Sequence, residues 1–242
     1  PSKPENATAL VVKNLNITNN KGSVELTDTK EFLNDFDTKG HLANTTQLGL
    51  LAQDNGKFVV NVVEATGDVN GAGLTLKLGN EEINKETTHT LAIKQDGEKV
   101  ADATYGLQGM VSADMPNKGI NVVYGVTTLK LAEGKQLELR PAGDTQDDAT
   151  LTAQLTGEGG LLINKAGDLA EVSISNADNK FTGQTTVKGG TLKLLSSNAL
   201  GQKDSHTEKV ALENGSALAL VGEEAKPISA YAGALSTTDE SK

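Results

Sequence analysis

The sequence predicts an all-β protein in which the chain winds as a parallel β-solenoid. Of its 242 residues only 36% are hydrophobic and 3% aromatic, so a single large globular core is not expected. Leucine and valine alternate with threonine, asparagine and lysine, and 26 glycines punctuate the chain. The third observation is a short repeat: an apolar-x-apolar triplet, a polar turn with glycine, and a second alternating segment. Such a unit is too poor in apolar groups to fold alone, and stacking on its neighbours buries them.

The repeat is clearest in two segments that align without a gap. Residues 129–139 (LKLAEGKQLEL) match residues 210–220 (VALENGSALAL), apolar on apolar and glycine on glycine. Looser copies occupy residues 15–26, 50–60, 69–76, 155–163 and 187–194. Since residues i and i+2 of a strand share a face, each Leu-x-Leu triplet is expected to bury two side chains and expose the one between them.

One turn glycine from each copy shows the spacing of the repeat. The glycines at 22, 56, 73, 134, 159, 189 and 215 are separated by steps of 34, 17, 61, 25, 30 and 26. Most steps are about 25 residues, which suits one coil of a solenoid, and the step of 61 is as long as two or three missing coils. A β-sandwich also has short strands and glycine turns. We favour the solenoid because sandwiches usually contain more aromatic residues and proline and less regular glycine spacing.

Three stretches depart from the repeat. Residues 31–36 form the only segment with helical character, which is short and rich in aspartate and asparagine. Residues 80–119 are polar and contain LAI, then QDGE, then a valine, which predicts a hairpin with an Asp-Gly turn. We expect this segment to leave the rod, either as an inert surface hairpin or as a place where binding differs between relatives. Residues 223–242 are expected to be a polar C-terminal tail or the start of a linker.

Composition narrows the classes of partner. Lysine and arginine number 22 against 32 aspartates and glutamates, a net charge of -10 with no basic cluster, so we expect no binding to nucleic acid. The absence of cysteine excludes disulfides and thiolate metal sites. No stretch approaches the roughly 18 consecutive apolar residues of a membrane helix, and the first residues are unlike a signal peptide. We therefore expect no direct membrane insertion of this segment and interpret it as a mature or excised piece.

No arrangement of residues predicts an enzyme, and we expect no catalytic, cofactor-binding or metal site. Asp204, Ser205 and His206 bring the residue types of a catalytic triad together, but side chains adjacent in sequence cannot adopt the relay geometry. His41, His89 and His206 lack the spacing of zinc ligands. Carboxylates that a polysaccharide-cleaving enzyme or a calcium ion would use occur at Asp35 and Asp37, Glu81 and Glu82, and Asp144, Asp147 and Asp148. These lie in turn-like polar stretches, where carboxylates are normally solvated.

Residues 155–220 resemble a known repeat. The resemblance is carried by LTGEGGL at 155–161, NKFTGQTTVKGGTLKL at 179–194 and NALG at 198–201. These segments closely resemble the passenger-associated repeat of Gram-negative type V autotransporters, the family of the AIDA-like adhesins. That repeat reads Gly-x-Gly-x-Leu, then Asn-x-Tyr-Thr-Gly-x-Thr-Thr-Val-x-x-Gly-Thr-Leu, then Asn-Ala-Leu-Gly. Phe181 stands where the family commonly has tyrosine, which keeps the ring and loses the hydroxyl. The resemblance covers about a quarter of the chain strongly, and the first 154 residues share only the coil pattern.

The resemblance implies a right-handed parallel β-helix that forms part of an exported passenger. Phe181 would lie inside the rod, with Val187, Leu192 and Leu194 pointing inward and tight corners at Gly183 and at Gly189 and Gly190. The passenger would reach the cell surface or the extracellular space, anchored through a cognate outer-membrane β-barrel elsewhere in the parent chain. The expected domains are coils at 1–149 with the insertion at about 80–119, the passenger-associated repeat at 150–222, and the polar segment at 223–242.

Two functions follow from the resemblance. The first is a non-enzymatic adhesin, with a role in virulence, that binds a host-cell surface or matrix component, or the same passenger on a neighbouring bacterium. The flanks of a solenoid repeat the same polar rows, so many weak contacts add up. Outward residues would include Lys130, Glu138, Lys188 and Lys193. The second is an autochaperone or stalk, centred on residues 150–222, that promotes folding and secretion of the passenger or spaces a distal functional domain.

Overall fold

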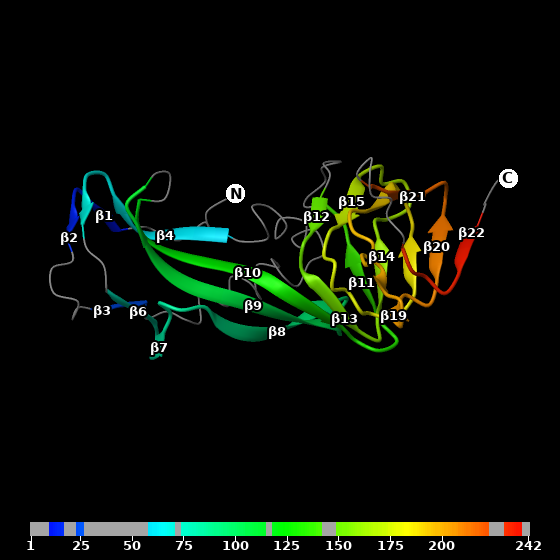
Figure 1. Ribbon diagram of the computed structural model, residues 1–242, viewed down its shortest axis with the longest axis horizontal. Coiled ribbons are helices and arrows are strands. Elements are labelled where there is room, and N and C mark those ends of the chain that lie inside the picture. Colours follow the sequence, from blue (N-terminus) through cyan, green and yellow to red (C-terminus); the bar gives the residue numbers. More distant parts are fainter. Residues whose placement is uncertain are drawn as a thin grey trace.

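A computed structural model describes most of the chain (Figure 1). The described residues are 10–16, 23–26, 58–70, 74–114, 118–141, 149–222 and 230–238. They form strands joined by turns and contain no helix, which confirms the all-β class predicted from the sequence. Accordingly, none of them belongs to a helix that is long and apolar enough to cross a bilayer. The helical segment considered at residues 31–36 lies outside the described residues.

The centre of the molecule is a long, mainly antiparallel sheet. In spatial order its strands are β1 (Leu10–Val12), β4 (Phe58–Ala65), β10 (Gly119–Leu131), β9 (Glu98–Ser112) and β8 (Thr87–Gln95). β1 pairs parallel to β4, whereas β4, β8, β9 and β10 pair antiparallel. In Figure 1, β9 and β10 run along the molecule and join the N-terminal strands to the C-terminal ones.

β8 and β9 form the hairpin predicted within residues 80–119. They meet at Asp96 and Gly97, whose φ angles of 51° and 80° are typical of a type I′ turn. The antiparallel pairing continues along β10 past residue 119, as far as Leu131. The long step between glycines 73 and 134 therefore contains this sheet, and the interpretation as missing coils is wrong. Antiparallel neighbours are joined by a two-residue turn and need no crossover, so the glycine spacing of the coils does not apply to them.

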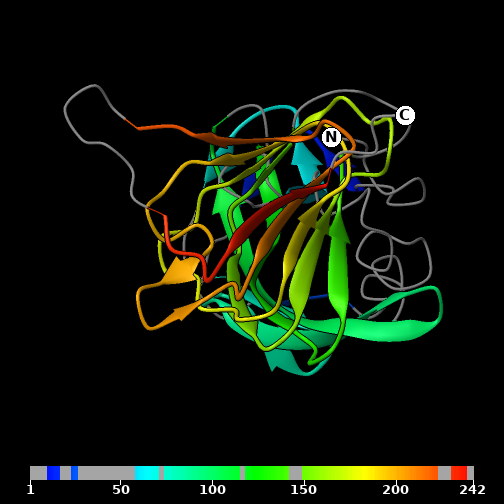
Figure 2. The same ribbon diagram turned by 90° about the vertical axis from the view of Figure 1, so that its right-hand side faces the viewer.

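The C-terminal strands lie in three parallel rows (Figures 1 and 2). The first row starts where the end of β10 pairs with β13 (Gln154–Gly157). The second consists of β11 (Gln136–Leu139), β14 (Gly160–Ile163), β16 (Thr185–Val187), β20 (Val210–Glu213) and β22 (Leu235–Thr238). The third consists of β12 (Ala149–Leu151), β15 (Glu171–Ile174), β17 (Thr191–Leu194) and β21 (Ala217–Leu220). The chain visits the three rows in this order on its first two passes, from β10 to β12 and from β13 to β15, and on later passes its described strands pair in parallel only in the second and third rows. A small hairpin of β18 (Gly201–Gln202) and β19 (Ser205–His206) lies between β17 and β20.

The register of these rows reproduces the predicted repeat. In the second row Leu161 pairs with Thr185, Thr185 with Val210 and Val210 with Leu235, so the step from one strand to the next is almost constant. In the third row the steps from Glu171 to Thr191 and from Thr191 to Ala217 are less equal. The step most common between the turn glycines is therefore the length of one pass.

The N-terminal strands form a further parallel pair of passes. β1, β2 (Leu15–Asn16) and β3 (Ser23–Leu26) pair with β4, β5 (Val69–Asn70) and β6 (Thr75–Leu78) respectively, all parallel. Ser23 pairs with Thr75, so the step along the chain is about twice that of the C-terminal rows. β7 (Glu81–Glu82) then folds back antiparallel onto β6.

The interior of the C-terminal rows is a column of apolar side chains from alternate strand positions. Val187, Leu192, Leu194 and Phe181 are fully buried, as the sequence predicts. Lys193, between the two leucines, stays partly exposed. Burial of side chains at i and i+2 places two apolar groups per short strand inside, so a chain with few aromatic residues still obtains a continuous core.

Two glycines allow successive passes to approach closely. A Cβ atom on Gly183 would overlap the carbonyl of Gly159, and one on Gly190 would overlap the carbonyl of Ala170. Gly190 also has a φ of 59°, in the region that glycine adopts without strain. The tight corners predicted at Gly183 and at Gly190 are confirmed.

β22 lies within residues 223–242, where we expected a polar tail or linker. Its sequence LSTT extends the second row by pairing parallel with β20. Leu235 is 63% exposed, so the strand is held by main-chain hydrogen bonds more than by burial. Pairing through the backbone makes few demands on side chains, which explains why a polar segment can add a strand.

Candidate functional site

A threonine-rich row crosses the exposed side of the central sheet. Thr90 pairs with Thr104, Thr104 with Thr128, and Thr128 with Gln154, so four strands each contribute one residue. The strand neighbours Ala103, Leu129 and Leu155 are fully buried. Because successive side chains of a strand point to opposite sides, the row of threonines lies on the outer side of the sheet.

Neighbouring positions on the same side are polar or small. Ala92, Asp102, Lys130 and Thr156 form the next row, and Thr88, Gly106 and Gly125 flank the first row on its other side. We call this surface the threonine face, and it consists of Thr88, Thr90, Ala92, Asp102, Thr104, Thr128, Lys130, Gln154 and Thr156. Thr88, Thr90, Ala92 and Lys130 are exposed, and the other members are half-buried. The face carries no aromatic ring.

The chemistry of the threonine face is that of a hydrogen-bonding surface with little charge. Each threonine hydroxyl donates and accepts, and Gln154 adds an amide. Asp102 forms an ion pair of 2.7 Å with Lys99, which leaves Lys130 as the exposed cation of the face. Because threonine side chains are short and β-branched, few rotamers are lost when they make a contact. The surface therefore suits many weak polar contacts better than one deep binding site.

The four residues predicted to face outward have different roles. Lys130 is exposed on the threonine face. Glu138 lies 3.7 Å from Lys165, and Lys193 lies 2.8 Å from Glu171, each pair joining neighbouring passes. The fourth, Lys188, is half-buried. The sequence does not reveal these pairings, because the partners are about one pass apart along the chain.

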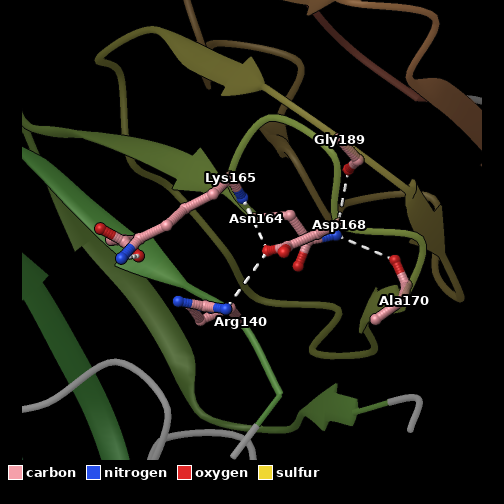
Figure 3. A network of polar contacts seen from close by, with 7 residues as sticks. Arg140, Asn164, Lys165, Asp168, Ala170 and Gly189 are labelled. Carbon is pink, nitrogen blue, oxygen red and sulfur yellow. Dashed lines mark hydrogen bonds and ion pairs between the residues drawn. The ribbon is translucent and has the colours of Figure 1, made fainter. Parts of the chain in front are cut away.

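A second polar cluster occupies the corner between β14 and β15 (Figure 3). The side-chain amide of Asn164, which is fully buried, donates to the carbonyls of Ala170 and Gly189 at 2.9 and 3.0 Å. The Asp168 carboxylate accepts from the main-chain nitrogen of Lys165 at 2.8 Å and lies 3.6 Å from Arg140.

This corner joins three successive passes. Arg140 follows β11, Asn164 and Asp168 follow β14, and Gly189 precedes β17. Asn164 has a φ of 58°, which asparagine tolerates better than most residues. Its amide ties the carbonyl of Ala170 to that of Gly189 in the next pass, so the cluster serves the stacking of passes.

Asp204, Ser205 and His206 lie in the β18–β19 hairpin and are not arranged as a triad. The Ser205 hydroxyl donates to the carbonyl of Lys180 at 2.9 Å. The His206 Nδ1 lies 3.1 Å from the carbonyl of Gln202, and the ring packs near Tyr231 with centroids 6.2 Å apart. Asp204 is exposed. A serine whose proton is held by a carbonyl is not activated by a neighbouring base.

The other candidate acids and histidines divide into two groups. Glu81 lies 3.2 Å from the Nε2 atom of His89, and Glu82 is exposed and pairs with Lys77 through the backbone. The remaining candidates, His41, Asp35, Asp37, Asp144, Asp147 and Asp148, lie outside the described residues. Within the part that the structure describes, no three histidine or acidic side chains are placed to hold a metal ion.

The central sheet also contains a buried tyrosine that the sequence pattern does not single out. Tyr105 is 1% exposed, and the His89 ring stacks on it with centroids 5.3 Å apart. Burial, together with the nearby Glu81 carboxylate, raises the pKa of Tyr105 to about 12. Both causes disfavour the negatively charged phenolate. The phenol therefore stays neutral in the folded protein at pH values where an exposed tyrosine ionises.

The raised pKa of Tyr105 predicts alkaline destabilisation. Below pH 10 the phenol is neutral in the folded and unfolded chain, so its contribution is complete there. As the pH rises from 10 to about 12, the unfolded chain loses the proton first, and the free energy of unfolding should fall by up to about 3 kcal/mol. Urea titrations across this range should show a smaller loss for Tyr105→Phe than for the wild type. Tyr231→Phe, at an exposed ring, is the control and should behave like the wild type. Equal losses in all three proteins would contradict the prediction.

Comparison with known proteins finds similarity to two proteins of Escherichia coli (strain K12). One is described as an uncharacterized lipoprotein, YdeK, and is 34% identical over 180 residues, which cover 73% of this chain and 13% of that protein. The other is described as an uncharacterized protein, YuaQ, and is 32% identical over 163 residues, which cover 65% of this chain and 12% of that protein. The chain thus spans about an eighth of the length of these relatives. No protein-family model and no solved structure matches the chain.

Proposed function

We propose that this chain is a length of right-handed parallel β-helix within an autotransporter-like passenger. The second and third parallel rows, which the chain visits alternately with similar steps along the chain, support the β-helix. The right hand is the one that parallel crossover connections adopt. The residues that resemble the passenger-associated repeat, 155–220, coincide with the most regular part of these rows.

We place the passenger, again as a proposal, at the cell surface. The name of one relative, a lipoprotein, favours attachment to a membrane, and the resemblance to autotransporters favours the outer membrane, through a cognate β-barrel in the parent chain. The greater length of the relatives agrees with a rod that continues beyond this segment.

Within this passenger, we propose that the segment is a non-enzymatic adhesin and that the threonine face makes the contacts. The observation that carries the proposal is the row of hydroxyl and amide groups across four paired strands. Its partner would be a host-cell surface or matrix component, or the same passenger on a neighbouring bacterium. One face contributes little affinity, and many copies on a cell would act together through multivalency. A net charge of -10 argues against nucleic acid as the partner.

The test uses the full-length parent protein displayed on cells. The variant carries Thr88→Lys, Thr90→Lys and Ala92→Lys, three exposed positions of the threonine face on β8. Long charged side chains would prevent close contact without changing the core. We expect normal surface display, measured with antibody on intact cells, and a loss of about tenfold or more in either attachment to host cells or cell-cell aggregation. The assay that changes identifies the partner.

A matched control carries the same charge change elsewhere. Ala166→Lys, Ala177→Lys and Ser197→Lys are exposed and lie on turns outside the threonine face. This variant should be displayed and should adhere like the wild type. Full adhesion by the threonine-face variant, or an equal loss in the control, would refute the assignment of contacts to this face.

A role in folding and secretion is the second candidate, favoured by the dense polar pairing between passes in residues 150–222. The corner at Asn164 and the buried pair of Thr185 and Thr207, with hydroxyls 3.1 Å apart, hold each pass to the next. Deleting residues 1–140 from the displayed parent separates the candidates. Normal display with lost adhesion supports the adhesin, and normal display with full adhesion supports a spacer. Lost display assigns the deleted part to folding or export.

A further inference from the structure

The polar segment between β6 and β10 uses a side-chain amide to end the N-terminal passes. The main-chain nitrogen of Leu76 donates to Asn84 Oδ1 at 2.7 Å, and Asn84 Nδ2 donates to the carbonyl of Leu74 at 2.7 Å. Both groups belong to the side of β6 that faces away from its partner β3. A carboxamide offers an acceptor and donors like those of a peptide group. Asn84 therefore occupies the place of one peptide of a missing neighbouring strand.

The rest of this edge of β6 is also covered. β7 pairs with Lys77 and Leu78, and the main-chain nitrogen of Ile83 donates to the carbonyl of Leu76 at 2.8 Å. The carbonyl of Ile83 in turn accepts from Gly109 in β9 at 2.7 Å. β6 is thus closed to further strands by the segment that follows it in the chain.

The same polar segment covers the first strand of the second C-terminal row. The main-chain nitrogen of Glu138 in β11 donates to Gln95 Oε1 at 3.0 Å, and Gln95 Nε2 donates to the carbonyl of Glu138 at 3.3 Å. β11 pairs with β14 on its other side. Gln95 stands at the end of β8 beside the hairpin turn, so the tip of the hairpin lies against the outer edge of the row.

Two further contacts hold the hairpin tip near β11. The main-chain nitrogen of Ala132 donates to the carbonyl of Val100 at 2.9 Å. Lys135, one residue before β11, forms an ion pair with Glu98 at the start of β9, and this partner lowers the pKa of the Glu98 carboxyl. The tip is therefore tied to the chain that leads into β11 as well as to β11 itself.

We propose that residues 81–112 are a two-ended cap that separates two sets of parallel passes and denies their edges to a second copy of this chain. An uncovered strand edge presents unpaired donors and acceptors and takes up strands from other molecules. Asn84 and Gln95 each satisfy one donor and one acceptor of such an edge while adding no strand that extends it. The edge of β11 is more open to pairing with another strand than the edge of β6, because a single side chain, that of Gln95, covers it. This inference does not depend on the adhesive role of the threonine face.

The cap is tested by hydrogen exchange and sedimentation of the purified chain. In Gln95→Ala the amide of Glu138 should exchange about tenfold faster or more, whereas the amide of Leu161, which pairs with Gln184 in the next pass, should be unchanged. The same variant should self-associate in analytical ultracentrifugation at concentrations where the wild type is monomeric. Lys94→Ala, at an exposed neighbouring residue, is the control and should change neither measurement.

Two more variants keep the test decisive. Gln95→Glu keeps an acceptor oxygen but loses the donor, so the Glu138 amide should stay protected more than in Gln95→Ala. Asn84→Ala should speed exchange of the Leu76 amide in the same manner. Unchanged exchange at Glu138 in Gln95→Ala would overturn the cap. If the Glu138 amide exchanged faster but the variant did not self-associate, the proposal that the cap excludes a second copy of this chain would be wrong.

Discussion

Replacing Leu194 with aspartate is expected to unfold the C-terminal rows. Leu194 is fully buried in β17, where it pairs with Ile174 on one side and Leu220 on the other. The substitution removes a large apolar side chain and places a carboxylate among apolar neighbours, at a combined cost of about 5 kcal/mol or more. Since domains are stable by only about 5 to 15 kcal/mol, loss of the β signal in far-UV circular dichroism at neutral pH is the expected result.

The neighbouring residue provides the matched control. Lys193 points outward from the same strand and pairs with Glu171 at 2.8 Å. Lys193→Asp removes this pair and sets two acids side by side, which at a partly exposed site costs about 1 kcal/mol. The protein should stay folded with a slightly lower urea midpoint. If Lys193→Asp unfolded the chain as severely as Leu194→Asp, the register of the third row would be wrong.

Asn179→Ala is expected to be the most damaging polar substitution. Asn179 is fully buried, accepts from the main-chain nitrogen of Leu155 at 2.7 Å and donates to the carbonyl of Ala199 at 2.8 Å. One side chain thus connects an earlier pass to a later one. Alanine would leave a buried N–H and a buried C=O without partners, at a cost of about 3 kcal/mol or more.

Chemical denaturation measures this loss, and hydrogen exchange locates it. The Leu155 amide should become much less protected in Asn179→Ala, because its acceptor is gone. Lys180→Ala, at the exposed adjacent residue, should change the free energy of unfolding by less than about 0.5 kcal/mol. A wild-type urea midpoint for Asn179→Ala would mean that the amide does not hold the two passes together.

Much of the local structure was predictable because it depends on neighbouring residues. The Leu-x-Leu triplets predicted which side chains of β17 are buried, and the Asp-Gly pair predicted the turn between β8 and β9. The glycine spacing predicted the length of a C-terminal pass. The same spacing led to the wrong interpretation of residues 73–134, since a long gap between turn glycines is compatible with missing coils and with antiparallel strands alike.

The candidate contact surface was not predictable in the same way. Thr90, Thr104 and Thr128 are ordinary strand residues in the sequence, and their union in one row depends on the register of three strands. The pairing of Lys193 with Glu171 and of Gln95 with Glu138 likewise joins residues 22 and 43 positions apart. A polar residue in a strand is consistent with a solvated, a paired or a capping role, and only its neighbours across the sheet distinguish these.

The sequence by itself therefore determined the β class, the alternation of buried and exposed side chains and the length of the repeat. Each of these follows from interactions within a few residues: the opposite direction of successive side chains and the positive φ of glycine and asparagine. The tertiary structure alone decided that the polar segment after β6 closes two strand edges and that four strands align their threonines and glutamine. Strand pairing is made by backbone groups that all residues share, so the choice of partner and register is settled only when the strands pack together.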